Sequence, residues 1–127
     1  MLENLKILKM ASAMARYAAE RHQVLSQNIA NADTVGFRAK DLEPFADAYA
    51  RMGAVKSGHN AASNGIGGGA SFAKLIDAPG TEKPNGNSVS LEDQLTRTIA
   101  AQADHETATV LYKKTIDMLR LTLNSGA

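Results

Sequence analysis

The sequence predicts an all-α fold, and three observations support that prediction. Apolar residues make up 44% of the chain, yet aromatic residues make up only 5% and Trp is absent. The apolar residues are mainly Ala, Leu, Ile and Met, which suit helices that pack on helices. They also recur at steps of three and four near both ends of the chain, as one face of a helix requires.

The first expected element is a long helix over residues 3–31. Its apolar face has the following members: Leu8, Ala11, Ala15, Ala18, His22, Leu25 and Ile29. Because Ala11, Ala15 and Ala18 follow one another along this face, a neighbouring helix can approach closely there. We therefore predict that these three alanines lie at a contact between subunits.

A turn is expected where this helix ends, in the run NIANADTVGF. Asn28 and Asn31 lie on one side of the last helical turns. We predict that their amides bond both the free carbonyls at the helix end and a neighbouring chain. Gly36 is expected to adopt the left-handed conformation, while Asp33 and Thr34 hold the turn through local side-chain bonds.

A short helix should follow the turn, so that residues 32–52 contain both. Phe37 opens a short extended piece, GFRAK, and lies on one side of it. Pro44 fits the first position of a helix, and Phe45, Ala48, Tyr49 and Met52 would share a face.

Residues 53–90 are expected to be irregular, because eight of the ten glycines fall there. The run GIGGGAS has no apolar strand before it and no Gly-Lys-Ser/Thr after it, so it does not predict a phosphate loop. A segment of this composition is either disordered alone or ordered by neighbours.

A second long helix is expected over residues 91–124, with Ser90 and Asp93 forming a capping box at its start. Its predicted apolar stripe is Leu91, Leu95, Ile99, Tyr112, Ile116, Leu119 and Leu123. We predict that Tyr112, Ile116 and Leu119 contribute to a contact between subunits. The polar middle of the helix either faces solvent or forms hydrogen bonds between chains.

Several classes of function are not supported by the sequence. Fourteen Lys and Arg against thirteen Asp and Glu give a net charge of +1, too balanced for a nucleic-acid-binding protein. There is no Cys, the three His stand singly, and no nucleophile lies beside a base. The sequence therefore predicts no enzyme, metal or cofactor site. It also predicts no membrane-spanning helix and no secretory signal peptide.

A chain of two long helices and a large loop cannot bury both apolar faces by itself. Burial of apolar surface contributes roughly 25 cal/mol per Å², whereas the loss of conformational entropy costs about 1.5 kcal/mol per ordered residue. For such a chain the net free energy of folding is near zero or unfavourable. The remaining apolar surface must meet other chains, and the whole of residues 1–127 is expected to form one structural unit.

Two motifs resemble a known family. SQNIANADTVGFRAKDL (residues 26–42) is similar to the signature of bacterial flagellar rod and hook proteins. GNSVSLEDQL and the closing HETATVLYKKTIDMLRLTLNSG resemble the FlgB family, the proximal rod proteins of the basal body. Val35 stands where the family usually has Pro, and Phe37 where Tyr is commoner. The turn is therefore expected to gain its rigidity from packing.

The resemblance implies a structural protein whose N- and C-terminal helices pair as an antiparallel coiled coil. Copies would stack helically in the proximal rod and transmit torque. The implied partners are further copies, other flagellar rod proteins, and the adaptor and export-gate proteins at the rod base. The implied location is the basal body across the periplasm, reached without a cleaved signal peptide. A soluble helical adaptor or export-chaperone-like binding protein remains the alternative.

Overall fold

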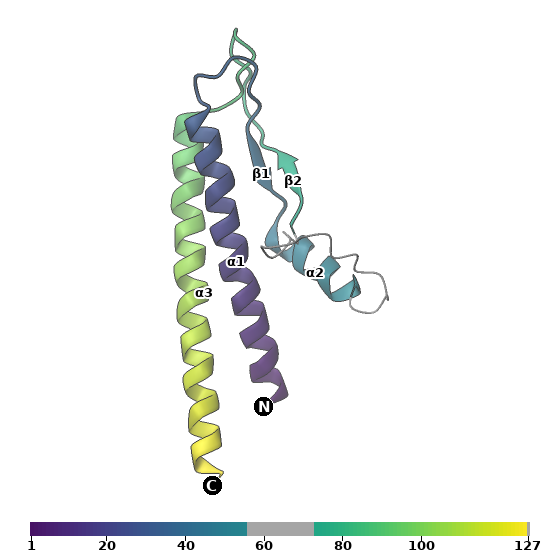
Figure 1. The fold of residues 1–127 in the computed structure, drawn as a ribbon, viewed down its shortest axis with the longest axis vertical. Helices are drawn as coiled ribbons and strands as arrows, with labels where there is room; N and C mark the ends of the chain where they lie inside the picture. Colours follow the sequence, from purple (N-terminus) through teal and green to yellow (C-terminus); the bar gives the residue numbers. More distant parts are fainter. Residues whose placement is uncertain (56–72, 127) are drawn as a thin grey trace, which may run out of the picture.

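The computed structural model describes residues 1–55 and 73–126. Two long helices, α1 (Leu2–Ala30) and α3 (Leu91–Ser125), lie side by side (Figure 1). The chain reverses at one end of this pair, so both termini lie at the other end, where α3 reaches beyond α1 (Figure 1). The predicted all-α class with paired antiparallel terminal helices is confirmed.

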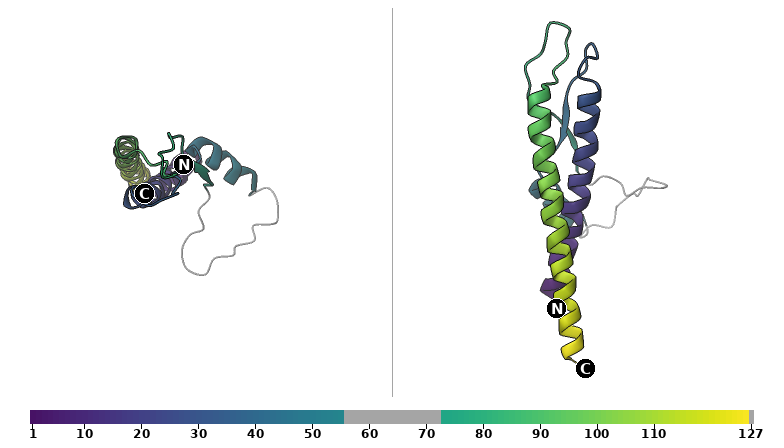
Figure 2. Two further views of the ribbon diagram at one scale, coloured as in Figure 1. Left: turned by 90° about the horizontal axis from the view of Figure 1, so that it is seen from above. Right: turned by 90° about the vertical axis from the view of Figure 1, so that its left-hand side faces the viewer.

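The remaining elements form a small unit beside α1, which we call the arm. It contains β1 (Lys40–Leu42), α2 (Phe45–Val55) and β2 (Leu75–Asp77). Figure 2 shows the arm on one side of the helical pair. Pro44 precedes α2, and its carbonyl accepts hydrogen bonds from Asp47 and Ala48, both at 3.2 Å. Its fixed φ suits the start of a helix, as the sequence indicated.

The two-stranded sheet was not predicted from the sequence. β1 and β2 are antiparallel, with Lys40 opposite Asp77 and Leu42 opposite Leu75. Strands of three residues are too short to display the alternation by which a strand is recognised. Part of the predicted irregular segment 53–90 is therefore regular, while GIGGGAS and His59 lie outside the described residues.

The contact between α1 and α3, which we call the seam, has a seven-residue repeat. Its buried members are Ala11, Ala18 and Leu25 on α1 and Gln94, Ala101, Ala108 and Thr115 on α3. A seven-residue spacing keeps one narrow stripe facing the partner helix, as in a coiled coil. Small side chains allow the two backbones to approach closely.

The first half of the predicted apolar stripe on the C-terminal helix does not contribute to the seam. Leu91, Leu95 and Ile99 are exposed, and the seam instead uses the smaller or polar residues beside them. The sequence pattern identified residues that share a face of the helix, but it did not predict which face packs against α1. In the second half of the stripe, Ile116 and Leu119 are partly buried, whereas Tyr112 and Leu123 are exposed.

Two small apolar clusters hold the arm and the chain reversal in place. One joins Tyr17, Leu42, Ala48 and Ala73, with Val24 and Phe45 against it. The rings of Tyr17 and Phe45 meet edge to face, with centroids 5.4 Å apart. The other cluster joins Ala32, Ala39, Ala78 and Val89, with Phe37 against it. Phe37 thus lies on the inner side of the extended piece.

Candidate assembly site

The chain reversal between α1 and α3, which we call the tip, interlocks two segments far apart in sequence. Residues 31–39 follow α1, and residues 78–90 precede α3. The side-chain amide of Asn87 donates to the carbonyls of Asn31 at 2.9 Å and Thr34 at 2.7 Å. Asn87 is fully buried. Asn87 lies in GNSVSLEDQL, and Asn31 and Thr34 lie in SQNIANADTVGFRAKDL, so two of the stretches that resemble the family are in contact.

Gly36 has a φ of +73°, which confirms the left-handed conformation expected from the sequence. The amide of Phe37 donates to the carbonyl of Thr34 at 3.2 Å, which closes a four-residue turn. A turn in which the third residue has a positive φ and the second does not is of type II. Gly86 also has a positive φ, and a Cβ on it would lie 3.3 Å from the Cα of Gly36. Sequence reasoning missed this second glycine.

Val35 occupies the second position of this turn, where Pro is favoured. Its amide donates no recorded hydrogen bond within the described residues. We expect Val35→Pro to stabilise the fold by about 0.4–1 kcal/mol, because it restricts the unfolded chain. Gly36→Val should instead cost about 1–3 kcal/mol through backbone strain. Thermal unfolding followed by circular dichroism would check both, and a lower midpoint for Val35→Pro would contradict the turn assignment.

Asn31 ends α1 in the way that the sequence suggested. Its side-chain amide donates to the carbonyl of Gln27 at 2.8 Å, one of the carbonyls that a helix end leaves free. Its side-chain oxygen accepts a bond from the Thr34 hydroxyl at 3.1 Å. A bond from Asn31 to a neighbouring chain stays a prediction.

Asn28 differs from the expectation. Its side chain is 1% exposed, and its amide nitrogen donates to the carbonyl of Lys40 at 2.6 Å and to Gln94 at 2.9 Å. Its oxygen accepts from the backbone amide of Lys40 at 3.1 Å. The amide is fully used inside the chain, where it joins α1 to β1 and α3, so it has no donor left for another chain.

These contacts predict that Asn28 contributes more than Asn31 to the free energy of unfolding. Asn28→Ala leaves the backbone groups of Lys40 and the side-chain oxygen of Gln94 without this partner, which should lower the free energy of unfolding by about 1–3 kcal/mol. Asn31→Ala removes bonds at a half-exposed helix end and should cost only a few tenths to about 1 kcal/mol. Urea unfolding of both variants at one protein concentration would test the order. Equal losses of stability would show that the bonds from Asn28 to β1 and α3 contribute no more than the helix-end bonds of Asn31.

A buried ion-pair cluster attaches the arm to both helices. Asp41 on β1 is 3% exposed. It accepts two hydrogen bonds from Arg21 of α1, at 3.0 and 3.1 Å, and one from Arg97 of α3 at 2.6 Å. Arg97 also donates to Asp93 at 2.8 Å. The cluster therefore joins residues from α1, β1 and α3 at one point.

The same contacts set the ionisation of Asp41. Burial alone would raise its pKa, but the hydrogen bonds from Arg21, the Leu42 amide and Arg97 hold the pKa below the usual 3.8. The carboxylate is thus charged at neutral pH. No local pattern indicates this cluster, because its members lie far apart in the sequence and match no motif.

The other site residues predicted from the sequence fall into two groups. Ala11 and Ala18 are buried in the seam, so the neighbouring helix that they approach is the chain's own α3. Ala15 is only partly buried, beside the seam. Tyr112, Ile116 and Leu119 lie on the second half of α3, where Tyr112 borders a groove that also contains Leu8. Whether they touch other subunits stays a prediction.

No helix in the described ranges has an apolar stretch long enough to cross a membrane. The described part of the chain also contains no group of three or more His, Cys, Asp or Glu placed to hold a metal ion. Its strongest features are the tip, the ion-pair cluster and the exposed apolar helix faces.

Comparisons with known proteins agree with this geometry. Residues 10–38 match the family model of the flagella basal body rod protein, a range that includes the end of α1 and the type II turn. The chain is also similar to the flagellar basal body rod protein FlgB of Agrobacterium fabrum (strain C58), with 26% identity over 135 residues and 96% of both chains covered. The chain therefore resembles the FlgB family of flagellar basal body rod proteins, and both comparisons support a structural role in the flagellar rod.

Proposed function

We propose that the chain is a subunit of the proximal rod, where copies assemble helically and transmit torque without catalysis. One observation carries this proposal: large aliphatic side chains of α3 face outward, while the seam is built mainly from small ones. Leu95 and Ile99 are 56% and 71% exposed, whereas Ala11 and Ala108 are fully buried. A helical pair with so narrow a seam gains stability when other chains cover its outer faces.

The end of the helical pair at which both termini lie adds to this argument. Its exposed apolar residues are Met1, Leu2, Leu5, Met118, Leu121 and Leu123. Exposed apolar residues gathered in one place are typical of protein contact surfaces. We assign this end to contacts with neighbouring rod subunits.

The partners in this proposal are copies of the chain, other rod proteins, and the adaptor and export-gate proteins at the rod base. The subunit would lie in the basal body within the periplasmic space, and would be exported without a cleaved signal peptide. Long helices packed against several neighbours can carry torque, because the load is shared among many small contacts.

The proposal can be tested by deleting the gene and complementing the strain with a tagged copy. We expect the deletion to abolish swimming and rod formation, and the tagged chain to copurify with isolated basal bodies. A deletion strain with complete rods would contradict the proposal. Recovery of the chain only in a closed complex with one partner would support the helical adaptor instead.

A further inference from the structure

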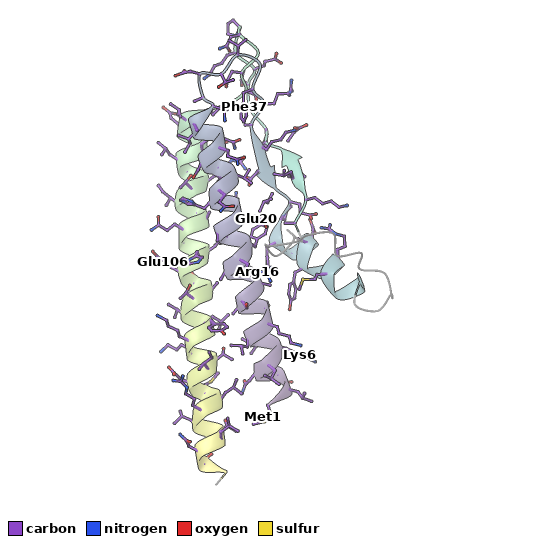
Figure 3. All side chains as sticks on the ribbon, in the orientation of Figure 1. Met1, Lys6, Arg16, Glu20, Phe37 and Glu106 are labelled. Carbon is purple, nitrogen blue, oxygen red and sulfur yellow. The ribbon has the colours of Figure 1, made fainter. Side chains whose placement is uncertain are left out.

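α3 carries an exposed ridge on the side away from the seam. Its members, which we call the outer ridge, are Glu92, Leu95, Ile99, Glu106 and Val110, all exposed. Their steps of three, four and seven place them on one face of the helix. Figure 3 shows Glu106 on the side of α3 that faces away from α1.

The outer ridge is negatively charged as well as apolar. Arg97 is the only Lys or Arg between residues 92 and 110, and it is engaged with Asp41 and Asp93. Leu95, Ile99 and Val110 are 56%, 71% and 55% exposed. A surface that fits this ridge must therefore offer apolar contacts and positive charge.

The same chain contains a groove of that character. Its lining includes Leu8, Lys9, Ser12 and Arg16 of α1, together with Met52 of α2 and Tyr112 of α3. Lys9 and Arg16 are exposed and form no ion pair within the described residues. The apolar side chains and the two free cations complement the outer ridge in both polarity and charge.

The groove and the outer ridge of one molecule face different directions. Arg16 lies on α1, whereas Glu106 projects from α3 away from it (Figure 3). They cannot meet within one chain, but the ridge of one copy can enter the groove of the next. The pair then still offers one free groove and one free ridge, so a head-to-tail contact of this kind can add further subunits and builds an open helical assembly when its rotation does not close a ring.

We propose that the outer ridge of α3 docks into the basic groove between α1, α2 and α3 of a second copy. This inference rests on the proposed function, because it assigns the contact through which rod subunits join. The occupant is a second copy, since a convex acidic ridge and a concave basic groove occur together on one chain.

Cross-linking can test the contact, because the chain contains no Cys of its own. Ser12→Cys marks the groove, and Ala103→Cys marks the flank of the ridge. Basal bodies from swimming cells would be treated with a short bismaleimide. We expect neither single variant to form dimers, and the double variant to form a ladder of dimers and larger products. Thr81→Cys combined with Ala103→Cys is the matched control and should give no ladder.

Each result decides between the two proposals. Dimers from either single variant, or a double variant without a ladder although the chain is present in basal bodies, would overturn the docking inference but not the rod assignment. A ladder of equal strength in the Thr81 control would also overturn it. Absence of the chain from basal bodies would instead contradict the proposed function, and this inference with it.

Charge reversal gives a second test that needs no engineered Cys. Lys9→Glu with Arg16→Glu should reduce the amount of chain in basal bodies, and so should Glu92→Lys with Glu106→Lys. Combining all four changes should restore most of the loss, because the charges again complement each other. No recovery in the combined variant would count against the contact.

Discussion

Asp41→Asn is expected to detach the arm from the helical pair, at a cost of about 3–5 kcal/mol. The substitution removes the charge that Arg21 and Arg97 share, so that Arg21 loses its carboxylate partner and Arg97 keeps only Asp93. Asp41 bonds to a cation of α1 and to a cation of α3. Thermal unfolding followed by circular dichroism, together with swimming in soft agar, would measure the loss.

Asp77→Asn is a matched control on the neighbouring strand. Asp77 pairs with Lys40, but both side chains are exposed, and exposed pairs contribute about 0–1 kcal/mol. If the two variants lose equal stability, the buried cluster is not what holds the arm in place.

The same cluster predicts a pH dependence. The pKa of Asp41 is lower in the folded state than its usual 3.8, so the cluster contributes fully above that value. Its contribution is lost as the pH falls through the lower, folded-state pKa. We expect the stability difference between the wild type and Asp41→Asn to be constant from about pH 5 to 7 and to shrink below about pH 4.

Ala18→Leu is expected to force the two long helices apart and to block rod assembly while export continues. Ala18 is 1% exposed in the seam, and inserting a larger side chain into a packed contact costs about 1–3 kcal/mol. That cost recurs in every subunit of the rod. Soft-agar swimming, basal-body yield and the amount of exported chain would separate failed assembly from failed export.

Ala19→Leu is the control, because Ala19 is the next residue on the same helix and is exposed. It should affect folding little. Normal swimming of Ala18→Leu would show that the seam tolerates the larger side chain, and that the close approach of α1 and α3 is not required.

Local chemistry explains which parts of the fold could be predicted. Gly36 and Pro44 impose their own backbone conformations, so a turn and a helix start were found at these positions. The long helices carry periodic patterns over many turns, which makes them easy to recognise. Features of this kind depend on neighbours in sequence.

The missed features depend on residues far apart in the chain. Asn28 bonds Gln94, and Asp41 bonds Arg97, across the fold. No spacing rule connects such pairs. The direction that the aliphatic stripe of α3 faces was not predicted, because periodicity shows which residues share a face but not whether α1 or another chain covers that face. In a subunit of an assembly, such residues can instead remain exposed until another chain covers them.

A cryo-EM reconstruction of isolated basal bodies would show whether other rod subunits cover the exposed apolar faces of this chain. We expect Leu95, Ile99 and Val110 to be buried against a neighbouring subunit, while Asn28 and Asp41 keep their bonds inside one chain. A reconstruction in which this face of α3 borders solvent along the assembled rod would contradict this expectation.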